Sequence, residues 1–352
     1  MAKYLTISLE QKNRQAIEAQ LQAEPIDWDA VVKVSTAHLV LPALYCNLKR
    51  TNFLQYLPEE LVHYMEHITH LNRERNQQII TQATALNSLL LEYNITPIFL
   101  KGTGNLLEGL YQDISERMVG DIDFVLSNIK CFKAIDILKN DAYKINKNML
   151  NNHPDHRHFP RLVKQDNIAA VEIHKEVTVA KYRSEFNCKL IRKDAQLINN
   201  YSVLSFENQL SLSMIASQIN DHGFEFKRCA LRNAYDVFLL SKKVDTKKAI
   251  SKFTKLKNPL NCFLANCNLV FGDLESLGYF KTKKSENYLK AFNKSLYKKK
   301  SNLKINFKLI TFNLNKSFGI VGKSIFHSEN RKWLFNRIKS KIRSYTYSFK
   351  RN

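Results

Sequence analysis

Two aspartates separated by one residue, Asp121 and Asp123, are the residues whose types and spacing point most directly to chemistry. They stand in the apolar run 121–126, which predicts a buried strand. Because successive side chains on a strand alternate between its faces, both carboxylates point the same way, while Ile122 and Phe124 point into the core. Neighbouring carboxylates repel each other unless a cation lies between them, and Mg²⁺ or Mn²⁺ suits carboxylate and phosphate oxygens. The pair therefore predicts a divalent metal site.

Glycines interrupt the chain before the aspartate pair. The run 96–100 predicts a short buried strand, a Lys-Gly-Thr-Gly segment breaks it, and residues 105–111 predict an amphipathic helix. The free N–H groups and the dipole at a helix N-terminus favour anions. We therefore expect Gly102 and Thr103 to let the backbone approach phosphates, and Lys101 to supply a positive charge.

A third carboxylate comes from a predicted hairpin further along the chain. Residues 159–163 and 169–177 form its arms, and the Gln-Asp-Asn segment at 165–167 supplies the turn. On the second arm Glu172 and His174 share one face. Because this arm can lie beside the aspartate strand, we expect Glu172 to be the third carboxylate and His174 to point into the same cleft.

These motifs resemble the nucleotidyltransferase superfamily related to DNA polymerase β, in which a small-residue pair, a gap of about one helix and an Asp-x-Asp strand recur. Gly102 and Thr103 match the first part, with Thr in place of the usual Ser or Gly, and Asp121-Ile122-Asp123 matches the second. Over about residues 20–245 the chain is similar to a bacterial family of uncharacterised nucleotidyltransferases. The matching positions are Leu100-Lys101-Gly102, Tyr111, Arg117, Asp121-Ile122-Asp123 and Val171-Glu172-Ile173-His174.

The resemblance implies an α/β (α+β) fold, with a small mixed-sheet nucleotidyltransferase core flanked by helical N- and C-terminal regions. It also implies transfer of a nucleotidyl group from an NTP by a two-metal mechanism with Mg²⁺ or Mn²⁺. The expected catalytic and metal-binding residues are Asp121, Asp123 and Glu172, with Glu in place of the more usual Asp. The expected nucleotide-binding residues are Lys101, Gly102, Thr103, Arg117 and His174, the histidine serving as a nucleotide contact or a proton shuttle.

Three hypotheses about the function remain open, and they differ in what, if anything, accepts the nucleotide. In the leading one, NMP moves onto a hydroxyl of a small molecule, a sugar or a protein. In the second, the acceptor is RNA, such as a transfer-RNA 3′ end. A toxin-like enzyme that modifies RNA is one form of this hypothesis. In the third, the protein is a catalytically silent nucleotide-binding or interaction module.

Patterning divides the chain into four regions. Apolar periodicity predicts helices first, strands from about residue 95 and helices again from about residue 180. The regions are a helical N-terminal region 1–94, the nucleotidyltransferase core 95–180, a helical region 181–280 and a basic C-terminal extension 281–352.

Local signals place several helices and one ion pair. Asp27 is a good N-cap for a helix that begins at residue 28. Pro58, followed by two glutamates, opens a long helix that continues to about Tyr93. In the second helical region Arg232 and Asp236 are one turn apart, which predicts an i,i+4 ion pair.

Positive charge is concentrated at the C-terminus. The formal net charge is +22, and residues 281–352 hold 20 Lys and Arg against 2 Glu, which is +18 of that total. The other 280 residues carry only +4. Such segregation predicts contact with nucleic acid or an anionic membrane surface. A helix predicted at 333–342 fits a membrane interface about as well as RNA, and a solvated tail without any partner also explains the composition.

Cysteine usage and hydropathy bear on location. The six cysteines form no Cys-x-x-Cys pair, which argues against a zinc site or a disulfide framework and for a reducing compartment. Residues 1–10 lack the apolar core of a signal peptide, and no run approaches the ~20 apolar residues of a spanning helix. We expect a cytoplasmic protein, and the basic tail leaves attachment to a membrane surface open.

Overall fold

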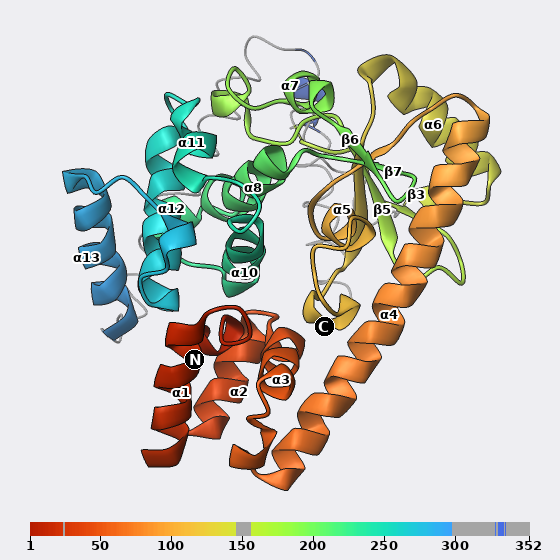
Figure 1. The fold of residues 1–352 in the computed structure, drawn as a ribbon. Coiled ribbons are helices and arrows are strands. Elements are labelled where there is room, and N and C mark those ends of the chain that lie inside the picture. The colour runs from red at the N-terminus through yellow and green to blue at the C-terminus, as the bar shows by residue number, and fades with distance from the viewer. Residues whose placement is uncertain (24, 146–155, 298–327, 329, 334, 336–352) are drawn as a thin grey trace, which may run out of the picture.

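A seven-stranded mixed sheet lies among helices (Figure 1). The computed structural model describes residues 1–352 except 24, 146–155, 298–327, 329, 334 and 336–352. This mixed sheet with flanking helices confirms the fold class expected from the sequence. Among the described residues, no helix combines the length and the apolar character that crossing a bilayer requires.

The N-terminal region is built of helices, as predicted. Asp27 caps the second α-helix by accepting a hydrogen bond from the backbone N–H of Ala30 at 2.9 Å. Pro58 is the N-cap of the longest helix, and Glu59 and Glu60 lie in its first turn, where the positive helix end favours acids. The elements are the 3₁₀ turn η1 (Ala2–Leu5), α1 (Gln11–Ala23), α2 (Trp28–Ala37), α3 (Leu41–Arg50), the 3₁₀ turn η2 (Leu54–Tyr56) and α4 (Glu59–Glu92).

The sheet has the strand order β3-β4-β5-β2-β1-β7-β6. Its strands are β1 (Ile98–Phe99), β2 (Asp121–Val125), β3 (Lys144–Ile145), β4 (Leu162–Val163), β5 (Ala170–His174), β6 (Gln196–Ile198) and β7 (Tyr201–Val203). Between them lie α5 (Lys101–Leu107), α6 (Asn128–Asn140), α7 (Cys188–Lys193) and the 3₁₀ turns η3 (Ile114–Glu116) and η5 (Ala180–Tyr182). β2 and β5 run parallel, β1 runs antiparallel to β2, and β4 and β5 form the predicted antiparallel hairpin.

The long helix α4 runs beside the sheet and ties it to the N-terminal helices (Figure 1). The Gln82 side chain donates to the carbonyl oxygen of Ala169 at 2.9 Å and accepts from its N–H at 3.1 Å. Two residues further along α4, the hydroxyl of Thr84 lies 2.7 Å from the hydroxyl of Tyr201. Because Ala169 precedes β5 and Tyr201 begins β7, one helix holds strands on both sides of β2.

Two strands lie in the region that was predicted to be helical. β6 and β7 are three residues each, and Asn199 and Asn200 between them have left-handed φ values of 48° and 67°. Two successive positive φ angles are typical of the type I′ turn of tight hairpins, and asparagine tolerates this conformation. The Asn-Asn pair was thus the signal for a hairpin that sequence reasoning missed. The sheet continues beyond residue 180, where the predicted core ended.

The chain after the sheet is helical up to residue 297. The elements are α8 (Phe206–Ile215), the π-helix η6 (Ala216–Asn220), α9 (Gly223–Phe226), α10 (Leu231–Leu240), α11 (Thr246–Ser251), α12 (Lys257–Phe271), the 3₁₀ turn η7 (Glu275–Leu277) and α13 (Lys283–Tyr297). α13 packs on α12 and buries Tyr288 and Phe292. The start of the basic extension therefore belongs to the folded body. The helix predicted at 333–342 lies, apart from Trp333 and Phe335, outside the described residues.

Candidate active site

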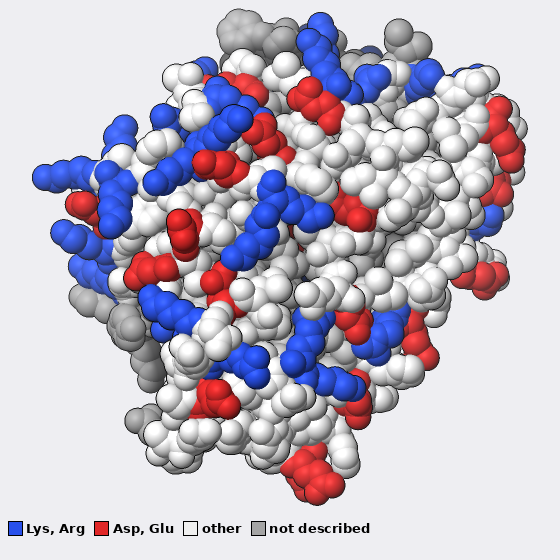
Figure 2. Space-filling model, viewed as in Figure 1, with Lys and Arg blue, Asp and Glu red and all other residues white. Residues whose placement is uncertain are grey.

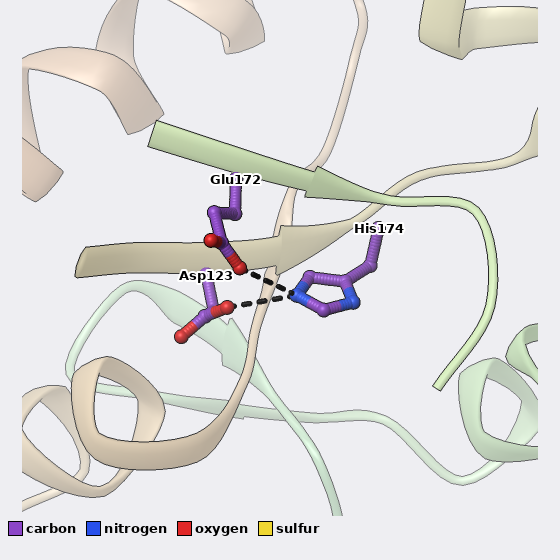
Figure 3. Close-up of side chains that lie close together, drawn as sticks. All are labelled: Asp123, Glu172 and His174. Atoms are coloured by element: carbon purple, nitrogen blue, oxygen red, sulfur yellow. Dashed lines mark hydrogen bonds and ion pairs between the residues drawn. The ribbon is translucent and has the colours of Figure 1, made fainter. Parts of the chain in front are cut away.

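The carboxylates expected from the sequence share one face of β2 and β5. In the parallel pairing of these strands, Asp123 is directly opposite Glu172. Strand alternation adds Asp121 and His174 to the same face. Asp123, Glu172 and His174 converge in Figure 3 and are 7%, 4% and 0% exposed. Two neighbouring strands thus present a buried polar cluster on one face of the sheet.

Three of these side chains offer ligand atoms to one metal ion. Atoms of Asp123, Glu172 and His174 all lie within 4.8 Å of one another. Nε2 of His174 is 2.7 Å from Oδ1 of Asp123 and 3.6 Å from Oε2 of Glu172. Asp121, which the sequence placed in the metal set, is outside this cluster. The structure instead adds His174, which the sequence predicted as a nucleotide contact, to the candidate ligands.

Lys101 lies against the same carboxylates. Its Nζ donates to Oδ1 of Asp123 at 2.7 Å and is 3.9 Å from Oε2 of Glu172. The predicted helix start at residue 105 is wrong, since α5 begins at Lys101. Lys101 has a left-handed φ of 53°, a conformation that costs a residue with a side chain about 1–2 kcal/mol. The ion pair with Asp123 helps to hold this strained conformation.

Small residues bring the first turn of α5 close to β2. A Cβ atom at Gly102 would lie 2.9 Å from Cγ2 of Val119. The Thr103 hydroxyl donates to the carbonyl oxygen of Asp121 at 2.9 Å. Both residues are buried. Close packing therefore overrides the low helix propensity of glycine and extends the helix back to Lys101.

Arg161 is a site residue that sequence reasoning missed. Its Nε donates to Oε1 of Glu172 at 2.5 Å, and an Nη donates to Oδ2 of Asp121 at 2.9 Å. Arg161 immediately precedes β4, whose Leu162 pairs with Val171 of β5. An arginine on the hairpin arm opposite a predicted catalytic glutamate was the available signal. The guanidinium bridges the two carboxylates, one on each strand.

Burial and neighbouring charges shift the three carboxyl pKa values in different directions. Burial acts to raise the pKa of Asp123, but Lys101 and His174 outweigh it and lower that pKa. Burial likewise opposes ionisation of Glu172, yet the neighbouring side chain of His174 and the charge of Lys101 hold its pKa far below the ordinary value. Burial and the charge of Glu172 raise the pKa of Asp121. At neutral pH the ionised carboxylate of Asp123 therefore faces Lys101. The ionised carboxylate of Glu172 faces Arg161.

His158 borders the site beside Glu172. Its Nε2 is 3.5 Å from Oε1 of Glu172, and its ring centroid is 5.5 Å from that of His174. A β-bridge joins the backbones of the two histidines. Burial lowers the pKa of His158 to about 4, so that its imidazole is neutral at physiological pH.

Arg117 is buried in an ion pair away from the carboxylate cluster. Its Nε is 3.0 Å and 3.1 Å from the two carboxylate oxygens of Asp236, and Nη1 donates to the carbonyl oxygen of Met118 at 2.9 Å. The Tyr111 hydroxyl donates to Asp236 at 2.8 Å. Asp236, 2% exposed, therefore takes Arg117 as its ion-pair partner and not Arg232 as predicted. A buried carboxylate needs a buried cation, and the i,i+4 neighbour Arg232 is only half-buried in the first turn of α10.

Two buried asparagines of α4 hold the loop that leads into β2. Asn72 donates to the carbonyl oxygen of Ser115 at 2.6 Å. Asn76, one turn later, donates to the carbonyl oxygens of Ile114 at 2.6 Å and Arg117 at 2.7 Å. These bonds satisfy loop carbonyls that strands and helices leave unpaired. They fix the path of the chain four residues before Asp121, the first aspartate of β2.

Comparison with known proteins connects this site to a family. No curated protein matches the sequence. A family model described as uncharacterised nucleotidyltransferase matches residues 24–271. The match extends from just before α2 to the end of α12, contains every site residue described above and stops before α13. The match covers more than half of the chain and includes the strands that carry the carboxylates, so this protein belongs to the uncharacterised nucleotidyltransferase family.

Proposed function

We propose that this protein uses a divalent metal ion to move NMP from an NTP onto a hydroxyl of a small molecule, a sugar or a protein. Membership of a nucleotidyltransferase family supports nucleotidyl transfer in general. The observation that carries the proposal is the register of β2 and β5, in which Asp123 faces Glu172 with Asp121 on the same side. Side chains on paired strands of a packed sheet are held rigidly enough for catalysis.

The side chains present fit a divalent ion. Asp123 and Glu172 offer carboxylate oxygens and His174 offers an imidazole nitrogen, all within 4.8 Å. Such donors suit Mg²⁺ or Mn²⁺, and Asp121 on the same face completes the proposed catalytic set. When bound, the metal would neutralise charge at the α-phosphate and promote ionisation of the acceptor hydroxyl.

The transfer step exchanges one bond to the α-phosphorus for another, and the cationic residues of the site can bind the phosphates during this step. The acceptor oxygen bonds to the α-phosphorus, the bond from that phosphorus to the α,β-bridging oxygen breaks, and pyrophosphate leaves. The hydroxyl proton passes to a carboxylate of the site or to water. Lys101 and Arg161 now pair with carboxylates, and both side chains are long enough to turn towards the triphosphate. Gly102 and Thr103 complete the proposed nucleotide site at the start of α5.

The contacts of Arg117 indicate a positioning role. Its guanidinium carbon would be 3.8 Å from a Cβ atom at Gly102, while its Nε is committed to Asp236. We therefore propose that Arg117 positions the start of α5 and the loop before β2, in place of the direct nucleotide contact expected from the sequence.

Incubation with each of four α-³²P-labelled NTPs tests the proposed function. Cell lysate separated into protein, RNA and small-molecule fractions supplies the acceptor, with Mg²⁺ and Mn²⁺ in separate reactions. Label in one fraction that an Asp121→Asn/Asp123→Asn variant fails to produce is the expected result. No label in any fraction, from protein shown to be folded by circular dichroism, would contradict the proposal and favour the silent nucleotide-binding module.

The basic C-terminal region favours RNA as a second candidate acceptor. Lys281, Lys283, Lys284, Lys290 and Lys294 are exposed on and beside α13. Figure 2 shows Lys and Arg side chains projecting from the edge of the molecule that α13 forms in Figure 1. Positively charged surfaces bind phosphate backbones with steep salt dependence.

A truncation separates the two acceptor classes. Ending the chain after Tyr297 removes the rest of the basic extension and keeps α13, which packs on α12. Turnover of a small-molecule acceptor is expected to survive this truncation. Loss of label transfer to RNA, together with loss of salt-dependent RNA binding, would support the second candidate.

A further inference from the structure

We propose that Nε2 of His174 is a direct metal ligand together with Asp123 and Glu172, and that the site therefore prefers Mn²⁺ to Mg²⁺. We further propose that the ammonium group of Lys101 competes with the metal for this position. Both statements rest on the proposed function for the presence of a metal. They go beyond it by naming a nitrogen ligand, the class of ion and an internal competitor.

The three ligands form a built site rather than a loose acidic cluster. All three side chains are buried, and two paired strands of the sheet hold them. Nε2 of His174 points between the two carboxylates, 2.7 Å from Oδ1 of Asp123 and 3.6 Å from Oε2 of Glu172 (Figure 3). Oxygen-only sites suit Mg²⁺, whereas an imidazole nitrogen shifts the preference towards transition-metal ions.

The other ring nitrogen of His174 prepares Nε2 for metal binding. Nδ1 is 3.2 Å from the backbone carbonyl oxygen of Glu176. A carbonyl oxygen only accepts hydrogen bonds, so Nδ1 carries the hydrogen and donates it. Nε2, which faces the carboxylates, is therefore the ring nitrogen that can bind a metal ion through its lone pair once it carries no hydrogen. Metal-binding histidines are commonly oriented in this way by a backbone carbonyl.

Hydrogen bonding alone leaves Nε2 with conflicting neighbours. Nζ of Lys101, which only donates, is 3.3 Å from Nε2. Oδ1 of Asp123, which as a carboxylate only accepts, is 2.7 Å from the same Nε2. Nε2 satisfies one neighbour as an acceptor or the other as a donor, never both. A metal ion bound to both Nε2 and Oδ1 removes this conflict.

Lys101 is placed to act as the competing cation. Its Nζ lies 2.7 Å, 3.3 Å and 3.9 Å from the nearest ligand atoms of Asp123, His174 and Glu172. A positive charge at these distances repels a divalent ion strongly. The side chain is 27% exposed, so it has a path out of the cluster towards solvent and the triphosphate. When Lys101 binds a phosphate of the triphosphate, the affinity of the site for the metal should therefore rise. By thermodynamic linkage, metal binding should raise the affinity for the triphosphate by the same factor.

Mn²⁺ binding to the purified full-length protein without NTP tests the inference directly. Electron paramagnetic resonance of free Mn²⁺ gives the affinity, and electron spin-echo modulation reports whether ¹⁴N is coordinated. We expect ¹⁴N modulation in the wild type and its loss in His174→Gln, with affinity weakened by at least about tenfold. Lys101→Met should instead tighten Mn²⁺ binding by about tenfold, because the competing charge is gone. His70→Gln, at an exposed position of α4, is the matched control and should change neither signal.

The outcomes separate this inference from the proposed function. Bound Mn²⁺ without ¹⁴N modulation in the wild type would overturn the histidine ligand, and this measurement depends on no variant that must fold. Equal affinities for Mg²⁺ and Mn²⁺ would overturn the preference, and weaker binding by Lys101→Met would overturn the competition. Each of these results leaves nucleotidyl transfer intact. Conversely, ¹⁴N-coordinated Mn²⁺ without label transfer in any fraction would uphold the site and contradict the proposed reaction.

Discussion

Asp123 and Glu172 stand directly opposite each other on the paired parallel strands β2 and β5, 49 residues apart in the chain. The pairing brings two carboxylates that burial would disfavour as ions into contact with Lys101 and Arg161. A parallel pair leaves little freedom in this placement, because a shift of one residue would move either carboxylate to the opposite face of the sheet.

Replacing Asp123 by Asn is expected to reduce label transfer by about 10²- to 10³-fold or more, because a charged ligand and the partner of Lys101 are lost together. The change keeps the size of the side chain, so the fold should persist. Initial rates at saturating NTP, with circular dichroism as a check of folding, provide the measurement. The matched control is Asp136→Asn on α6, where the side chain is 74% exposed, and its rate should equal that of the wild type. Transfer by Asp123→Asn at the wild-type rate would remove this carboxylate from the catalytic set.

Arg117→Met should destabilise the protein by about 3–5 kcal/mol, because it leaves the carboxylate of Asp236 buried without its ion-pair partner. Urea unfolding monitored by fluorescence measures the change. The double variant Arg117→Met/Asp236→Leu should recover much of the loss, since it removes both buried charges. Lys164→Ala breaks a half-exposed pair with Asp141 and should cost at most about 1 kcal/mol. Wild-type stability in Arg117→Met, with a raised KM for NTP, would restore the direct nucleotide contact expected from the sequence.

Glu108 should make the protein less stable as the pH rises from about 5 to 8. Burial raises the pKa of Glu108 to about 7 from an ordinary 4.5, although Gln209 donates a hydrogen bond to it. The folded protein therefore keeps a proton that the unfolded chain releases above pH 4.5. The resulting stability is fully present below that pH and is lost as the pH rises through 7, a change of about 3 kcal/mol.

Unfolding in urea at several pH values tests the role of Glu108. Glu108→Gln keeps the hydrogen-bonding shape of the side chain without its charge, so the stability of this variant should vary less with pH. Glu207→Gln, on α8 with a side chain 40% exposed, is the control and should keep the wild-type slope. A slope that Glu108→Gln leaves unchanged would assign the pH dependence to another group.

Three glycines around the site should respond differently to alanine. A Cβ atom at Gly104 would meet the backbone carbonyl oxygen of Phe99 at 2.8 Å, and backbone yields little, so we expect a loss of about 1–3 kcal/mol. At Gly102 the nearest atom, at 2.9 Å, belongs to the Val119 side chain, which can rotate, and the loss should be smaller. Gly120 has no atom within 4 Å of such a Cβ, and Gly120→Ala should be neutral or stabilising by up to about 1 kcal/mol. Thermal unfolding ranks the three variants, and any other order would contradict the close contacts described at these glycines.

Local sequence determined the elements that carry the chemistry. The alternation of Asp121-Ile122-Asp123-Phe124 predicted β2 and the common face of its carboxylates. The turn at 165–167 predicted the hairpin that brings Glu172 to the sheet, and Asp27 predicted the start of α2. Each of these features depends on residues a few positions apart, where side-chain periodicity and capping act without help from the rest of the chain.

Only the tertiary structure decided which charges meet. Arg161 bridges Asp121 and Glu172, and Arg117 takes Asp236 as its partner from 119 residues away, although Arg232 is one helical turn distant. Nε2 of His174 faces Asp123 because two strands far apart in sequence pair in one register. Likewise, α5 begins at Lys101 because packing on β2 outweighs glycine propensity. Burial selects these partners, since a buried charge pairs with whichever opposite charge the fold brings within reach, and spacing along the sequence does not contain that information.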